Sequence, residues 1–147
     1  MKITVWFMLL FILIGCASTN ELTEFTFYDS HGNEYNSLTA PSNLKKEFNI
    51  DVKPRMVVIA TSSKSNTKYK EQIDIISKVN AEEMQYLYVV ASSKEEDHSG
   101  YYVEKMNSER ILVGDDFKVI VYDEIGQIVI KSTNVIGVVE LKNHLTR

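Results

Sequence analysis

Cysteine is the residue type that this chain most lacks, because only Cys16 is present in 147 residues. A single cysteine forms no disulfide within the chain, and it leaves no pair of thiols for intramolecular thiol–disulfide exchange. Stability must therefore come from packing, and a hydrophobic content of 44% is sufficient for a core.

An excess of positive charge is also missing. The chain has 16 Lys and Arg residues against 20 Asp and Glu residues, which gives a formal net charge of −4. Such a balance argues against nucleic acid as a partner and against electrostatic binding to anionic lipid. The sequence has no glycine-rich phosphate loop, no internal repeat and no low-complexity segment. We therefore expect neither a nucleic acid partner nor a cofactor.

The N-terminal stretch has the pattern of an export signal. Lys2 supplies a positive charge, and the apolar run 3–14 that follows is shorter than the ~20 residues of a spanning helix. The sequence Leu13-Ile14-Gly15-Cys16 resembles the bacterial lipobox. The resemblance implies a thioether-linked diacylglyceryl group on Cys16, cleavage before it, and acylation of the new amino terminus with a chain such as palmitate. Two or more chains make a stable anchor, because each buried CH₂ contributes ~0.8 kcal/mol.

This pattern predicts a signal peptide over 1–15, a lipidated tether over 16–23 and a single domain over 24–147. The expected location is the cell envelope, with the membrane contacted through the N-terminal diacylglyceryl cysteine. Residue 17 is Ala, whereas Asp is the usual inner-membrane retention mark, so a Gram-negative source favours the outer membrane facing the periplasm. The alternatives are an ordinary signal peptide that ends in Gly-Cys, or a buried N-terminal strand.

The remaining chain alternates strand and helix patterns. Two strand-like segments around the turn signal 29–33 predict a hairpin over 24–36, and the segment 37–49 contains a cap followed by a short helix or turn. From Pro54 onward the apolar and β-branched runs predict strands, and apolar residues at helical spacing predict helices. The predicted strands are 56–60, 86–91, 117–122 and 128–131, and the predicted helices are 67–80, 101–107 and 135–145.

The order from Pro54 is β-α-β-α-β-β-α. The first two strands are joined through a helix and should be parallel by the right-handed crossover rule. The last two flank the tight turn 123–127 and should be antiparallel. We therefore predict an α/β fold with a mixed four-stranded sheet and helices on both faces, the thioredoxin-like order, over a core of 54–147. The 24–36 hairpin is an N-terminal addition to it.

Specific segments carry a family resemblance. Residues 54–60, the Ser-rich loop after them, the helix with Gln72, the run 117–127 and the segment 135–145 resemble thioredoxin-like domains of unknown function. Such domains occur in bacterial secreted proteins and as the C-terminal module of animal extracellular sushi-repeat and equarin-type proteins. Redox-active thioredoxins carry Cys-x-x-Cys in the loop after the first core strand, where a helix N-terminus lowers the thiol pKa.

This chain departs from the redox-active pattern at that loop, which reads Thr61-Ser62-Ser63-Lys64-Ser65. The family's cis-proline ahead of the third core strand has no counterpart in 113–116. We therefore expect no thiol redox chemistry. The resemblance places any ligand surface at loop 61–67 beside loop 114–116, since loops at the carboxyl ends of core strands commonly carry function. The candidate residues are Thr61, Ser62, Ser63, Lys64, Ser65, Asp115 and Asp116.

Other chemistry is weakly indicated. A serine nucleophile needs a base within hydrogen-bond reach, but His31, His98 and His144 lie in separate predicted elements, so capping and loop roles are favoured for the serines. Residues 95–98 are acidic or His, but four consecutive residues cannot all converge on one metal ion. Exposed tyrosines could form a partner surface, although strand alternation should bury part of each pair. These tyrosines are Tyr86, Tyr88, Tyr101 and Tyr102.

Three functions remain open on this basis. The leading one is a redox-inactive thioredoxin-like domain that binds or scaffolds an envelope protein partner. The alternatives are a thioredoxin- or peroxiredoxin-like enzyme that acts without its own thiol pair, and a structural envelope protein that uses its tyrosines.

Overall fold

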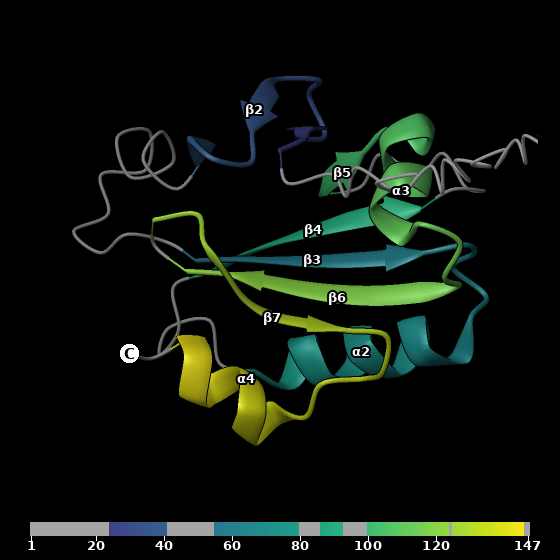
Figure 1. Ribbon diagram of the computed structural model, residues 1–147, viewed down its shortest axis with the longest axis vertical. Helices are drawn as coiled ribbons and strands as arrows, with labels where there is room; N and C mark the ends of the chain where they lie inside the picture. The colour runs from purple at the N-terminus through teal and green to yellow at the C-terminus, as the bar shows by residue number, and fades with distance from the viewer. Residues whose placement is uncertain (1–23, 41–54, 80–85, 93–99, 124, 146–147) are drawn as a thin grey trace, which may run out of the picture.

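Figure 1 shows the computed structural model, which describes residues 24–40, 55–79, 86–92, 100–123 and 125–145. The predicted signal peptide, lipidated Cys16 and tether lie outside these residues, as do most of the segment 37–49 and the acidic residues 95–98. None of the helices in the described ranges is long and apolar enough to span a membrane.

A seven-stranded sheet forms the centre of the molecule, in the order β2-β1-β5-β4-β3-β6-β7. The strands are β1 (Thr26–Tyr28), β2 (Glu34–Asn36), β3 (Arg55–Thr61), β4 (Tyr86–Ser92), β5 (Tyr101–Val103), β6 (Phe117–Tyr122) and β7 (Ile128–Ser132). The described helices are α2 (Thr67–Lys78), α3 (Lys105–Leu112) and α4 (Val138–Leu145).

Strand β3 is central, and all of its residues are buried. It pairs in parallel with β4, where Val58 lies opposite Val89, and antiparallel with β6, where Val58 lies opposite Ile120. Its continuous apolar sequence follows from this position, since a strand covered on both faces has no solvent side. The predicted parallel and antiparallel pairings are confirmed, including the β6–β7 hairpin.

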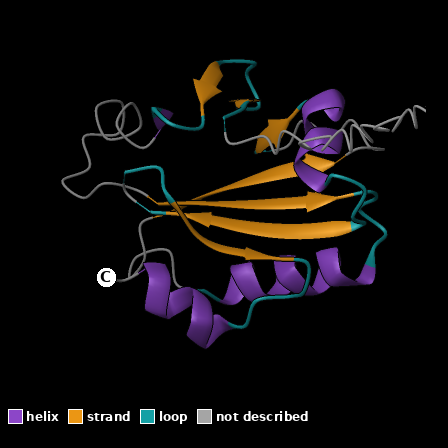
Figure 2. Ribbon diagram, in the orientation of Figure 1, coloured by secondary structure: helices purple, strands orange, loops and turns teal. Residues whose placement is uncertain are grey.

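Helices cover both faces of the sheet, as Figure 2 shows. Successive β3 side chains point to opposite faces. Val58 belongs to a cluster that includes Ile111 of α3, whereas Ile59 belongs to a second cluster with Ile76 of α2 and Leu141 of α4. The fold is thus the predicted α/β, thioredoxin-like arrangement, with α3 on one face and α2 and α4 on the other.

The prediction of a helix over 101–107 is wrong. Residues Tyr101–Val103 form β5, and the helix α3 begins only at Lys105. Aromatic and β-branched residues favour a strand, and β5 gains pairing on both sides: Val89 of β4 lies opposite Tyr101, and Tyr28 of β1 lies opposite Tyr102. The sheet therefore has seven strands instead of the predicted four, because β5 joins the predicted hairpin to the core.

The last helix also begins later than predicted, at Val138 instead of residue 135. The reason lies in Gln72, which is completely buried. Its Nε2 donates to the carbonyl oxygen of Ile136 at 3.2 Å, and its Oε1 accepts from the Ile136 N–H at 2.8 Å. The side chain thus bonds both backbone groups of Ile136, so these groups are paired with α2 and not within α4.

Candidate functional site

The loop after β3 is organised by its own hydroxyl groups. Thr61 Oγ1 donates to the carbonyl oxygen of Ser63 at 2.7 Å and accepts from the Ser63 N–H at 3.2 Å. The hydroxyls of Ser63 and Ser65 lie 2.8 Å apart, within hydrogen-bond distance. Short polar side chains commonly bond neighbouring backbone in this way, so the loop is held in a defined shape without a disulfide.

Helix α2 begins directly after this loop, with Asn66 as its N-cap. The Asn66 Oδ1 accepts from the backbone N–H of Lys68 at 2.9 Å and of Tyr69 at 3.4 Å. These bonds satisfy amides that have no partner within the helix. The N-terminus of α2 therefore points toward the end of the sheet where β3 terminates.

The loop before β6 has an unusual backbone. Val113 ends α3 in the left-handed conformation with φ 51°, and Gly114 follows with φ 85°. A β-branched residue rarely adopts positive φ, and the strain costs about 1–3 kcal/mol. The turn places the Asp115 N–H against the carbonyl oxygen of Leu112 at 3.1 Å.

The buried side chain of Lys118 stabilises the turn between α3 and β6. Lys118 is 3% exposed, and its Nζ donates to the carbonyl oxygens of Ile111 at 3.1 Å and Leu112 at 3.0 Å. The same ammonium lies 3.2 Å from Oδ2 of Asp115. A cation at the C-terminal end of α3 bonds carbonyl oxygens that lack a partner within the helix, and it complements the helix dipole.

The two loops meet at the carbonyl oxygen of Asp116. That oxygen accepts from the Ser62 N–H at 2.9 Å and from Asn66 Nδ2 at 3.4 Å. The hydroxyl of Thr61 lies 3.5 Å from the same oxygen. The loops that the sequence placed side by side are thus joined by hydrogen bonds.

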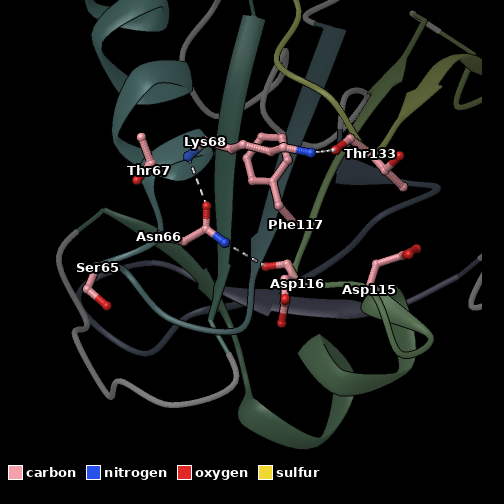
Figure 3. A pocket seen from close by; sticks show the side chains of 8 residues that line it. All are labelled: Ser65, Asn66, Thr67, Lys68, Asp115, Asp116, Phe117 and Thr133. Atoms are coloured by element: carbon pink, nitrogen blue, oxygen red, sulfur yellow. Dashed lines mark hydrogen bonds between the residues drawn. The ribbon is translucent and has the colours of Figure 1, made fainter.

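An open hollow of about 550 Å³ lies where these loops meet (Figure 3). Of the residues selected from the sequence, Ser65, Asp115 and Asp116 line the hollow. Thr61 is buried, and its hydroxyl bonds the backbone of Ser63. Residues 62–64 are half-buried. The lining is Ser65, Asn66, Thr67, Lys68, Asp115, Asp116, Phe117 and Thr133.

Several lining residues were not selected from the sequence. Asn66 carried a usable signal, because a cap residue before an amphipathic helix is expected to lie at the helix N-terminus. For Phe117 the sequence predicted only a place in a strand. Thr133 follows β7, and nothing in the local sequence brings it to this end of the sheet.

Charges of both signs surround the hollow. Lys68 extends past the Phe117 ring to Thr133 in Figure 3. The Lys68 Nζ donates to the carbonyl oxygen of Thr133 at 2.8 Å and to Oδ1 of Asn134 at 3.0 Å. Asp115 and Asp116 are exposed on the other loop. Within the described ranges no group of three His, Cys, Asp or Glu residues is arranged to hold a metal ion.

The described histidines lie away from the serine loop. His31 belongs to the turn between β1 and β2, and its N–H donates to Asp29. The carbonyl oxygen of His144 accepts from Arg55 Nη1 at 2.8 Å. Arg55 begins β3 and Thr61 ends it, so at ~3.3 Å per residue about 20 Å of strand separates these two ends. The described part of the chain thus brings neither histidine to the loop serines as a base, and His98 lies outside it.

The sequence matches no protein-family model and no curated protein. Solved structures with a similar fold exist. One is a proposed electron transfer protein from Aquifex aeolicus VF5, with a TM-score of 0.50, 14% identity, and coverage of 82% of this chain and 87% of that chain. Another is the thioredoxin domain of a thiol-disulfide oxidoreductase from Bacteroides vulgatus, with a TM-score of 0.48, 18% identity, and coverage of 76% and 84%.

A member of the Sco family of cytochrome c oxidase assembly proteins is also similar, with a TM-score of 0.47, 10% identity, and coverage of 76% of this chain and 81% of that chain. At such identities the likeness concerns the fold alone. The chain has a thioredoxin-like fold, and the loop that follows its first parallel strand carries serines and a lysine where redox-active thioredoxins carry thiols.

Proposed function

We propose that this chain is an exported, lipid-anchored protein whose thioredoxin-like domain binds a partner at the cell envelope without thiol chemistry. The binding surface is the hollow between loop 61–67 and loop 114–116. The observation that carries the proposal is the polar, thiol-free character of that hollow, which is built by hydrogen bonds onto the carbonyl oxygen of Asp116.

The lining suits recognition by hydrogen bonds. It presents hydroxyl groups from Ser65, Thr67 and Thr133, and carboxylates from Asp115 and Asp116. Phe117 also lines the hollow, although it is almost fully buried, so the accessible lining is mainly polar. A polar segment of a partner protein, with both donors and acceptors, fits this lining.

A disulfide exchange role is disfavoured by simple chemistry. Exchange requires a thiolate that attacks a disulfide sulfur and a second thiol that resolves the mixed disulfide. The serine hydroxyls of loop 61–67 supply neither group. Cys16 lies far before β3 in sequence, and the lipobox resemblance assigns its sulfur to a thioether.

A blocking substitution tests the hollow. The full chain, captured from native envelopes, is expected to retain a reproducible partner that is lost in Ser65→Tyr, because the larger ring fills the hollow. Ser77→Tyr is the matched control, since Ser77 is an exposed residue on α2 outside the lining. A partner that survives Ser65→Tyr would refute the assigned surface.

An activity assay separates binding from the enzyme alternative. The purified protein is expected to show no disulfide reduction and no peroxide turnover above a boiled control. Turnover above that control would replace the binding proposal with a thioredoxin- or peroxiredoxin-like enzyme acting without its own thiol pair.

The anchor is tested separately. Cys16→Ala should move the protein from the membrane fraction to the soluble exported fraction, because the acyl chains attach to that sulfur and to the amino terminus it creates. Ser18→Ala, two residues later in the tether, should leave the distribution unchanged. A variant without Cys16 that stays in the membrane fraction would contradict the lipoprotein assignment.

A further inference from the structure

A second surface lies on strands β5, β1 and β2, which are separated from β3 by β4. Tyr28 of β1 is in register with Glu34 of β2 on one side and with Tyr102 of β5 on the other. Residues in register on neighbouring strands share a face of the sheet. Glu104 follows Tyr102 by two residues with an extended backbone, at φ −59° and ψ 149°, and so returns to the same face. We call these four residues the tyrosine face.

This face is the one opposite α3. Tyr102 is in register with Val90 of β4, and Val90 is in register with Ile59 of β3, which packs toward α2. Helix α2 packs against β3 and α4, so it covers the middle of the sheet. Within the described residues, α2 and α4 thus leave the β2-β1-β5 part of this face uncovered.

The aromatic residues of this region divide between the two faces. Tyr101 packs edge-on against Phe27 and Tyr35 in the core, with ring centroids 5.9 Å and 5.7 Å away. Tyr28 and Tyr102 lie on the opposite face, with centroids 5.7 Å apart and planes tilted by 30°, and both are half-buried, as Tyr101 is. Tyr101 thus packs against the core cluster, whereas Tyr102 lies on the other face of the sheet.

Negative charge flanks the two rings. Glu34 and Glu104 are exposed, and in the described part of the chain neither forms an ion pair. Glu104 is the N-cap of α3, yet its side chain makes no capping hydrogen bond. Partial burial raises the pKa of Tyr28, and the negative charges of Glu104 and Glu34 raise it further.

We propose that the tyrosine face docks an arginine side chain of a protein partner. The electron-rich faces of two rings and two carboxylates all favour a cation at the same place. On this proposal the two rings, whose planes are tilted by only 30°, act together as a shallow platform for a flat group. A flat guanidinium can stack on such a platform while its N–H groups reach a carboxylate, whereas a compact ammonium stacks less well.

A labelled-tyrosine titration tests this proposal on the full chain. The probe is the acetylated peptide amide Gly-Arg-Gly-Arg-Gly, and the matched peptide carries citrulline, an uncharged isostere, at both arginines. The ring signals of Tyr28 and Tyr102 are followed by NMR and assigned with single Tyr→Phe variants. The arginine peptide should shift both signals in a saturable way that weakens as salt is added, and the citrulline peptide should not.

Substitutions give the second measurement. Glu34→Gln together with Glu104→Gln should weaken the arginine peptide about tenfold or more. Glu140→Gln is the control, because Glu140 is an exposed acid on α4, outside the tyrosine face. Equal shifts from the citrulline peptide, or unchanged affinity in the double variant, would overturn the proposal. Tetramethylammonium is titrated as a third probe. If it shifts the ring NMR signals of Tyr28 and Tyr102 and the arginine peptide does not, the occupant is a small cation and the arginine proposal is wrong.

The comparison of the two peptides is made on the unsubstituted chain, and the Tyr→Phe variants serve only to assign the signals. It therefore decides the matter even if the double Glu→Gln variant does not fold. The proposal is also independent of the hollow at loop 61–67. Loss of a partner in Ser65→Tyr says nothing about the tyrosine face, and failure of the peptide titration leaves the hollow untouched.

Discussion

Lys118 offers the sharpest test of how the candidate site is held together. Its ammonium donates to two carbonyl oxygens at the end of α3 and pairs with Asp115, while its side chain is only 4% exposed. Replacement by Met keeps the length and the apolar stem but removes every donor. The carbonyl oxygen of Ile111 then loses the Lys118 donor, whereas that of Leu112 still accepts from the Asp115 N–H at 3.1 Å.

The magnitude follows from what is left behind. An unsatisfied buried carbonyl costs about 1–3 kcal/mol, and this cost applies to Ile111, because Leu112 keeps one donor. Asp115 is 43% exposed, so its carboxylate regains water and adds little. Part of the loss is offset because no ammonium is desolvated on folding. We expect Lys118→Met to lower the free energy of unfolding by about 1–3 kcal/mol.

Urea unfolding of the full chain, followed by circular dichroism, measures this change as a lower midpoint at unchanged slope. Lys105→Met is the matched control, because Lys105 is an exposed residue at the start of the same helix. The control should change the free energy by less than about 0.5 kcal/mol. If Lys118→Met is no more destabilising than this control, the argument that the ammonium holds the turn is wrong.

Two further predictions concern other contacts of the fold. Gln72→Leu should lower the free energy of unfolding by about 2–4 kcal/mol, because both backbone groups of Ile136 lose their partner. Glu71→Leu is the control, since Glu71 lies on the exposed side of α2. Equal urea midpoints for the two variants would contradict the reasoning. For Asp29, the Asn33 side chain, the Asn33 N–H and the His31 N–H donate to the carboxylate and lower its pKa. A folded pKa below the ordinary 3.8 gives a stabilisation that is present above 3.8 and lost as the pH falls through the lowered value. Asp29→Asn should therefore remove this acid dependence from the amide NMR signals of the β1–β2 turn, and an unchanged acid profile in the variant would refute the assignment.

The central strands could be predicted from the sequence because burial on both faces requires apolar residues at successive positions. β3 and β6 are buried along their whole length, so nearly every residue is apolar or β-branched, and their predicted bounds agree with the structure within a residue. Strand β5 could not be predicted in the same way. Its three residues are followed closely by a helix, and what makes them a strand is pairing with β4 and with β1, of which β1 lies far earlier in the sequence.

The buried polar residues were missed for a related reason. Lys118 lies in an otherwise apolar strand. The local sequence does not indicate that its side chain donates to carbonyl oxygens at the end of α3. Gln72 reads as one more polar residue of an amphipathic helix, although it is completely buried. In both cases the partner is a backbone group, and backbone groups carry no sequence signal. The local pattern therefore locates strands and helices better than it locates the side chains that fix loops between them.

The same reasoning explains why the two loops of the candidate site adjoin without a thiol or a metal. Their contact depends on the backbone of Asp116, which accepts from the loop after β3. The antiparallel pairing of Thr61 with Phe117 sets the distance, since these residues lie opposite each other at the ends of β3 and β6. Any sequence that keeps this pairing and a polar loop of this length will bring the loops together. The chemistry of the hollow can therefore change, from thiols to hydroxyl groups, while its position at the end of the sheet stays the same.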